Sequence, residues 1–105
     1  MKIEVLYVPD CPNHAVALQQ LREILSSESV RAHVDEVPVR DSATAQRLKF
    51  PGSPTVRING RDVEPQSQES ESFGLMCRLY QDGRGGPSPQ RLRAAIQKAR
   101  KTEFE

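Results

Sequence analysis

The spacing of apolar positions changes several times along the chain, and each spacing predicts a different element. Residues 2–8 are rich in β-forming side chains and apolar on both faces after Glu4, which favours a central strand covered on both sides. Pro9 ends this run. Over residues 13–27 the apolar positions recur every three or four residues, which predicts an amphipathic helix. Its apolar stripe consists of Ala17, Leu18, Leu21, Ile24 and Leu25.

The next run has a period of two. Apolar and polar residues alternate over 30–39, which predicts a second strand with one wetter face. A strand, a helix and a strand in so short a stretch form a βαβ unit, so the two strands should be parallel. Asp41 is a plausible N-cap for a short helix over 42–49. The dipeptide Asn59-Gly60 predicts a type I′ hairpin that joins strands at 55–58 and 61–63.

The remainder of the chain is less regular. Residues 64–72 are nearly all polar and predict an exposed loop, and residues 81–87 form a second, glycine-rich loop. The apolar island between them, Phe73–Tyr80, fits either a short strand or a helical turn. Ser88-Pro89 reads as an N-cap followed by proline at the first helical position. A second apolar stripe then predicts a final helix, with Leu92, Ala95, Ile96 and Ala99 on its buried side.

Composition places the chain among ordinary globular proteins. Its 105 residues predict a single domain, with 36% hydrophobic and 28% charged residues. A net charge of +1 gives no argument for nucleic acid or for an anionic membrane as a partner. No apolar run has the length of a membrane span and no signal-peptide pattern is present, so we expect a cytoplasmic protein. Two cysteines are too few for a disulfide scaffold.

The first candidate for chemistry is Cys11, which lies where the first strand hands over to the first helix. The first N–H groups of a helix are unpaired and carry partial positive charge, so a sulfur there should be stabilised as the reactive thiolate. A buried structural thiol is the alternative. His14 follows within the same helical turn; it would favour the thiolate as an imidazolium or accept its proton as a neutral base. A solvated first-turn histidine is the alternative there.

The order β-α-β-α-β-β-α, with Cys11-Pro12-Asn13-His14 after the first strand and Ser53-Pro54-Thr55 before the third, resembles the thioredoxin-like superfamily. It looks like the small bacterial thioredoxin-like proteins, here with Cys-Pro-Asn-His in place of Cys-x-x-Cys. The resemblance covers residues 2–63 and the last helix, with 64–87 as an insertion. It implies a thioredoxin-like α/β fold, in which helices flank a central mixed four-stranded sheet. In that family the nucleophilic cysteine caps the first helix and a cis-proline lies beside the sulfur, and Cys11 and Pro54 match these positions.

The resemblance implies a thiol-based redox protein that works through a mixed disulfide at Cys11 without a cofactor. His14 would modulate the thiol, and Ser53 and Pro54 would bind substrate. If the Ser53–Pro54 bond is cis, it should turn Ser53 outward and leave its backbone N–H and C=O free to pair with an extended peptide or glutathione. Because His14 replaces the resolving cysteine, Cys77 or an outside thiol would resolve the mixed disulfide. The expected partners are therefore protein or low-molecular-weight thiols and disulfides.

Two other functions remain open from the sequence. Cys11 and Cys77, together with His14, would make a Cys/His/Cys set suited to a soft metal or metalloid, although their spacing fits no zinc motif. The chain would otherwise be a redox-inactive interaction module. Cys77 itself is either a partner of Cys11 or a packed thiol within the apolar island.

Overall fold

The computed structural model describes residues 1–64, 73–78, 80 and 85–103. The elements occur in the order predicted from the sequence. They are β1 (Ile3–Tyr7), α1 (His14–Ser27), β2 (Val34–Pro38), α2 (Ser42–Arg47), β3 (Thr55–Ile58), β4 (Arg61–Asp62) and α3 (Pro89–Glu103). None of the helices in these residues has the length and apolar character needed to cross a membrane.

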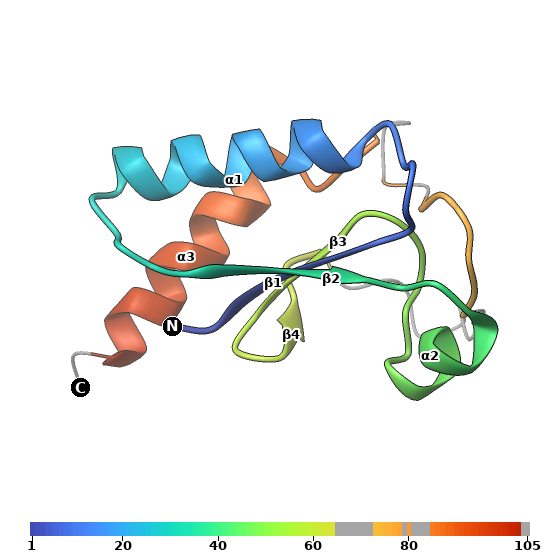
Figure 1. The fold of residues 1–105 in the computed structure, drawn as a ribbon. Coiled ribbons are helices and arrows are strands. Elements are labelled where there is room, and N and C mark those ends of the chain that lie inside the picture. The colour runs from blue at the N-terminus through green and yellow to red at the C-terminus, as the bar shows by residue number, and fades with distance from the viewer. Residues whose placement is uncertain (65–72, 79, 81–84, 104–105) are drawn as a thin grey trace.

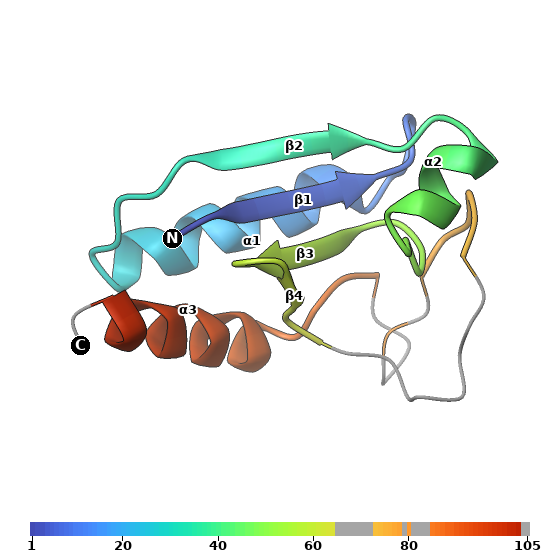
Figure 2. The same cartoon turned by 90° about the horizontal axis from the view of Figure 1, so that it is seen from below.

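The strands form one four-stranded mixed sheet in the order β2-β1-β3-β4, which confirms the predicted α/β class. β1 is parallel to β2, as the βαβ prediction requires, and antiparallel to β3, which in turn pairs antiparallel with β4. Figure 2 shows β1 and β2 running in one direction and β3 returning beside them. Ile3 lies opposite both Val34 and Ile58, so β1 is paired along both of its edges.

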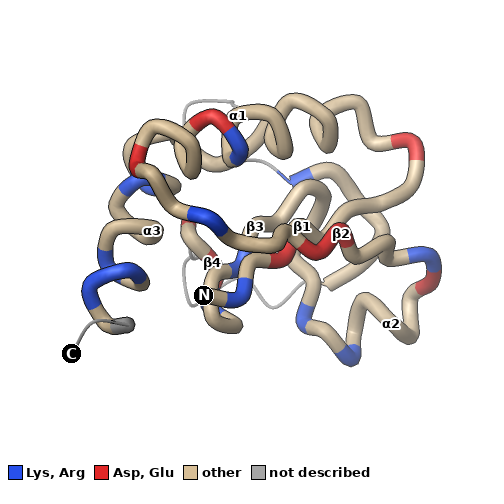
Figure 3. Tube along the Cα trace, turned by 60° about the vertical axis from the view of Figure 1, so that its left-hand side comes forward, with Lys and Arg blue, Asp and Glu red and all other residues tan. Residues whose placement is uncertain are grey.

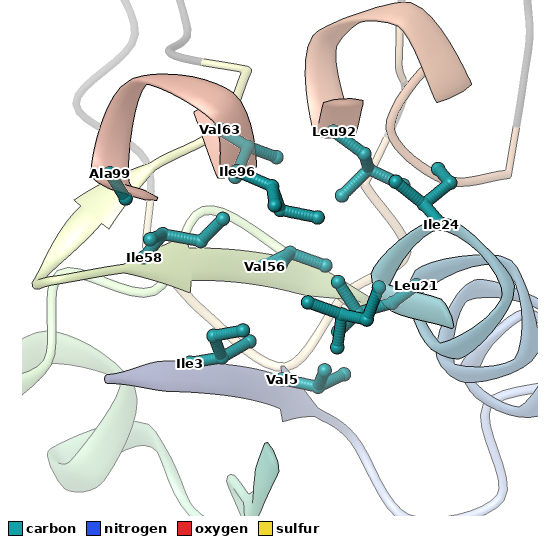
Figure 4. Close-up of a cluster of buried hydrophobic side chains, with 11 residues drawn as sticks. Ile3, Val5, Leu21, Ile24, Val56, Ile58, Val63, Leu92, Ile96 and Ala99 are labelled. Carbon is teal, nitrogen blue, oxygen red and sulfur yellow. The ribbon is translucent and has the colours of Figure 1, made fainter. Parts of the chain in front are cut away.

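Helices cover both faces of this sheet (Figure 1). Successive residues of β1 point to opposite faces, so Val5 packs with α1 and α3 whereas Leu6 packs with α2. The larger cluster joins β1 and β3 to α1 and α3 (Figure 4). Its buried side chains are Ile3, Val5, Leu21, Ile24, Leu25, Val56, Ile58, Val63, Leu92, Ile96 and Ala99. The smaller cluster, under α2, consists of Leu6, Val39, Ala45 and Phe50.

Two predicted elements are longer than the observed ones. β2 begins at Val34 rather than residue 30, because Val34 lies opposite Ile3, where β1 begins. The preceding residues instead close α1: the N–H of Val30 donates to the carbonyl of Leu25 at 2.9 Å, with Ser29 at a φ of 56° between them. The predicted helix over 42–49 ends at Arg47.

The backbone and side-chain contacts just after Arg47 explain why α2 ends there. Lys49 turns to a φ of 51°, and Arg57 from β3 donates to the Leu48 carbonyl at 2.7 Å and to that of Lys49 at 3.1 Å. The start of α2 is as predicted, since the side chain of Asp41 accepts a hydrogen bond of 2.7 Å from the N–H of Thr44.

The other predicted turns are also confirmed. Asn59 and Gly60 have φ angles of 53° and 81°, the positive values that a type I′ hairpin requires at both positions. Ser88 caps α3 through its Oγ, which accepts from the N–H of Arg91 at 3.1 Å. Pro89 is the first residue of that helix.

The two predicted loops fall mostly on residues 65–72 and 81–84, which lie outside the described residues. Glu64, expected to be exposed at the start of the first loop, is instead 8% exposed, so that part of the prediction is wrong. The reason is polar pairing: its carboxylate lies 3.5 Å from Nε of Arg91, and its backbone carbonyl accepts a hydrogen bond from Arg78. Local polarity in the sequence did not indicate these partners.

Glu28 joins the end of α1 to α3, along which lysine and arginine recur (Figure 3). Its Oε1 accepts hydrogen bonds from Nη1 of Arg93 at 2.6 Å and from Nε2 of Gln97 at 3.1 Å. Its backbone carbonyl accepts a third from Arg100 at 2.7 Å. The hydrogen bond from Arg93 is the main reason that the pKa of Glu28 lies below its ordinary value of 4.5.

We expect Glu28→Gln to lower the free energy of unfolding in a pH-dependent way. Because the pKa of Glu28 is lower in the folded chain, its contribution is fully present above the ordinary value of 4.5 and is lost as the pH falls through the folded pKa. Urea unfolding should therefore separate the variant from the parent at neutral pH and bring them together in acid. Glu23→Gln is the control, since within the described residues the carboxylate of Glu23 accepts a hydrogen bond from Gln19 of its own helix and none from α3. A difference independent of pH would contradict the charged contact.

Candidate functional site

Cys11 lies in the turn between β1 and α1 and is half-buried. Its N–H donates to the carbonyl of Val8 at 3.0 Å, and its carbonyl accepts from the N–H of His14 at 3.3 Å. Asn13, not Cys11, is the N-cap of α1, so the expectation that Cys11 caps this helix is wrong. None of the hydrogen bonds among the described residues ends on the Cys11 sulfur. The turn thus fixes the backbone of Cys11 by hydrogen bonds on both sides of the residue.

The imidazole of His14 contacts the sheet. It stacks on the ring of Tyr7 with the centroids 3.7 Å apart and the planes 2° from parallel. Its Nε2 lies 3.0 Å from Oε1 of Glu36 in β2, and only 19% of the side chain is exposed. The alternative of a solvated histidine is therefore wrong. The ring therefore contacts Tyr7 and Glu36, and no hydrogen bond within the described part of the chain joins it to the Cys11 sulfur.

Ser53 and Pro54 lie beside this turn. The Ser53–Pro54 peptide bond is cis, which confirms the expectation for this bond. Ser53 is 1% exposed, and its Oγ accepts a hydrogen bond of 3.0 Å from the N–H of Val8. Since the carbonyl of Val8 accepts from Cys11, a single residue of the turn connects Ser53 to Cys11.

The backbone of Ser53 is not free, and the expected open edge for a substrate is therefore wrong. Its N–H donates to the carbonyl of Met76 at 2.8 Å, and its carbonyl accepts from the N–H of Arg78 at 3.0 Å. These bonds make Cys77 the parallel bridge partner of Ser53. The Phe73–Tyr80 island is thus strand-like where it crosses Ser53, which decides between the two forms that the sequence left open.

Arg78, which the sequence analysis did not single out, fixes this pairing. It is 3% exposed, and its Nη1 donates to Oδ2 of Asp62 at 2.8 Å and lies 3.3 Å from Oγ1 of Thr55. Its Nη2 donates to the carbonyl of Glu64. The one signal in the sequence is a single basic residue inside an apolar island, whose burial requires a partner carboxylate.

Tyr80 completes this polar cluster. The guanidinium carbon of Arg78 lies 4.3 Å from the centroid of its ring, within the range of a cation–π contact. The hydroxyl of Tyr80 donates to the carbonyl of Pro54. Burial raises the pKa of Tyr80, which keeps its hydroxyl a donor. Burial also raises the pKa of Asp62, although the charge of Arg78 acts in the opposite direction.

Both cysteines are free thiols, Cys11 half-buried and Cys77 exposed. They are connected through Ser53, which pairs with Cys77 on one side and binds Val8 of the Cys11 turn on the other. The Cys/His/Cys metal set is not assembled, because the described residues contain no group of three or more His, Cys, Asp or Glu that could hold an ion.

Comparisons with known proteins give no family for the chain. No protein-family model matches it, and searches of the curated proteins and of the solved structures find no match. The assignment of a function therefore depends on the residues and contacts of this chain.

We expect Gly52→Ala to destabilise the protein more than Gly60→Ala does. Both glycines have positive φ, 137° and 81°, so both variants carry backbone strain of about 1–3 kcal/mol. A Cβ at Gly52 would also lie 2.9 Å from the Cα of Arg78, whereas a Cβ at Gly60 would meet nothing within 4 Å. Urea unfolding of the two variants measures the difference. Equal losses would show that Arg78 does not pack against Gly52 in solution.

Replacement of Arg78 should be costly. Arg78→Met leaves Asp62, whose side chain is 19% exposed, without its ion-pair partner, and loss of one member of a buried pair costs about 3–5 kcal/mol of unfolding free energy. The matched control is Arg47→Met, since Arg47 is exposed in the last turn of α2 and acts on the exposed carboxylate of Asp41, where an ion pair contributes less than about 1 kcal/mol. Similar losses in the two variants, measured by urea unfolding, would contradict the buried position of Arg78.

Proposed function

We propose that the chain is a thioredoxin-like protein whose function is thiol–disulfide exchange at Cys11. The family assignment is supported by the element order, by the mixed sheet with helices on both faces, and by a cis-proline directly before β3. Cys11 supports it by its place between β1 and α1.

One observation carries the redox proposal: the backbones of the two free cysteines are both connected to Ser53. Cys77 is its bridge partner, and Val8, which donates to its Oγ, accepts the N–H of Cys11. A disulfide requires the Cα atoms of its two cysteines to lie within about 7 Å of each other. Because Cys11 and Cys77 are both connected to Ser53, this arrangement favours a short distance between them. We assign Cys11 as the nucleophile, because it belongs to the turn before a helix, and Cys77 as the resolving thiol.

The reaction proceeds by two exchanges. The Cys11 thiolate attacks one sulfur of a disulfide RS–SR, forms a mixed disulfide with it, and releases the other sulfur as a thiolate that takes up a proton. The Cys77 thiolate then attacks the Cys11 sulfur and releases the second RS⁻, which is protonated in turn. One external disulfide is reduced to two thiols while the two cysteines are oxidised to one disulfide. His14 contributes by fixing the start of α1 against Tyr7 and Glu36.

The connection of both free cysteines to Ser53 also supports a second candidate, the binding of a soft metal or metalloid ion by Cys11 and Cys77 without turnover. The two candidates differ in a simple way. Metal binding predicts tight uptake of copper(I) that is lost in Cys11→Ser and in Cys77→Ser, with disulfide exchange at background. Exchange without measurable copper(I) affinity would favour the redox function.

We expect the reduced protein, incubated with glutathione disulfide, to end with no bound glutathione and one internal disulfide. Cys77→Ser should retain one glutathione on Cys11, because the resolving thiol has been removed. Intact-mass spectrometry before and after thiol alkylation measures both results. The change Ser27→Ala, at the opposite end of α1 from Cys11, is the control for handling and should behave as the parent. Absence of glutathione on Cys11 in Cys77→Ser would refute the proposed exchange, and retention of one glutathione by the parent would assign resolution to an outside thiol.

A further inference from the structure

The backbone around Ser53 determines which disulfides can reach Cys11. An unpaired stretch of strand beside a reactive thiol would accept an extended peptide by strand addition, with backbone hydrogen bonds supplying affinity. Here the chain supplies that strand itself. We propose that residues 73–78 (the 73–78 segment) permanently occupy the backbone hydrogen-bonding edge at Ser53. As a result, Cys11 exchanges with low-molecular-weight disulfides rather than with extended polypeptides. The inference rests on the proposed exchange at Cys11 and names its substrate class.

The segment uses the backbone groups that a peptide would need. Both the N–H and the carbonyl of Ser53 are bonded to it, to Met76 at 2.8 Å and to Arg78 at 3.0 Å. Its other end is held as well: Nε2 of Gln46 donates to the carbonyl of Phe73 at 2.9 Å, and the N–H of Gly74 donates to Phe50 at 3.3 Å. A second strand would find no donor or acceptor left on Ser53.

The segment also leaves no space between itself and the cis-proline turn. An ideal Cβ built on Gly52 would lie 2.9 Å from both Cα and Cβ of Arg78 and 3.0 Å from its nitrogen. These backbones are therefore in van der Waals contact, and only the absence of a side chain at Gly52 permits the approach. An incoming peptide has to remove the segment rather than lie beside it.

Removal is opposed by the buried side chains at the end of the segment. Displacing Arg78 would break its ion pair with Asp62 and leave a carboxylate that is 19% exposed without its partner. It would also remove Arg78 from the ring of Tyr80, whose hydroxyl is bonded to Pro54. Leu75 and Met76, at 44% and 40% exposure, contribute little burial to the segment, so the anchor is the polar cluster around Arg78.

A low-molecular-weight disulfide avoids this competition. It needs only to bring one sulfur to Cys11, which is half-buried, and it requires no backbone partner at Ser53. The bond that forms and the thiolate that leaves are the same as in the exchange described above. The inferred substrates are therefore disulfides whose recognition does not depend on a peptide backbone.

The test compares two reagents with the same leaving thiol in the Cys77→Ser protein, where Cys11 is the only thiol. One reagent is bis(2-hydroxyethyl) disulfide, and the other is a short extended cysteine peptide joined to 2-mercaptoethanol by a disulfide. Mass spectrometry gives the rate at which each adduct forms on Cys11. We expect the peptide to gain less than about threefold over the small disulfide, since it finds no backbone pairing. A peptide advantage of about tenfold or more, equivalent to about 1.4 kcal/mol, would overturn the inference.

Hydrogen exchange on the peptide adduct gives a second readout. The amides of Ser53 and Arg78, bonded to the segment and to Ser53 respectively, should stay protected after the peptide is attached. Loss of protection at Arg78 would show that the peptide displaces the segment and would refute the inference. A Tyr80→Phe change, which removes only the hydroxyl bond to Pro54, should raise the peptide rate relative to the small disulfide. If neither reagent reacts with Cys11, the proposed exchange itself fails, and the substrate class fails with it.

Discussion

The buried guanidinium of Arg78 is the interaction on which the arrangement around Pro54 depends. A charge that is 3% exposed must be neutralised and hydrogen-bonded, and this is done by Thr55 of β3, Asp62 of β4 and the carbonyl of Glu64, two residues after β4. The backbone of the same residue packs against Gly52, where a Cβ would lie 2.9 Å from the Cα of Arg78. The N–H of Arg78 also donates to the carbonyl of Ser53, so the buried charge and the pairing with Ser53 belong to one residue.

The sheet carries the same constraint to the turn that contains Cys11. β1 is paired on both edges, so Val8, just beyond its end, has a defined place from which its N–H reaches Ser53 and its carbonyl reaches Cys11. The stacking of His14 on Tyr7 fixes the start of α1 against the same strand. The position of Cys11 is thus set by β1. The segment that pairs with Ser53 from the other side, which includes Cys77, is anchored by Arg78.

Sequence patterns predicted the parts of this molecule that depend on near neighbours. The Asn59-Gly60 turn, the Asp41 cap and the Ser88-Pro89 start each need only residues within one turn, and each was found as predicted. The pairing of Ser53 with Cys77 depends on residues far apart in the sequence, and no local pattern contains it. The buried contacts of Glu64 and Arg78 were missed for the same reason, since a charged residue reads as exposed until its partner is known.

The chain has His14 rather than a cysteine in the first turn of α1, and its second cysteine, Cys77, lies opposite Ser53. A thiol at position 14 would lie in the first turn of α1 and would not interfere with an open strand edge. A thiol at position 77 can be presented only by chain that is itself paired with Ser53, because that pairing is what places Cys77 there. In the proposed mechanism, the resolving thiol and an extended peptide therefore compete for the same backbone groups. A protein that resolves its mixed disulfide from position 77 therefore has to use substrates that do not need the backbone N–H and carbonyl of Ser53. The position of Cys77 and the inferred substrate class are linked in this way.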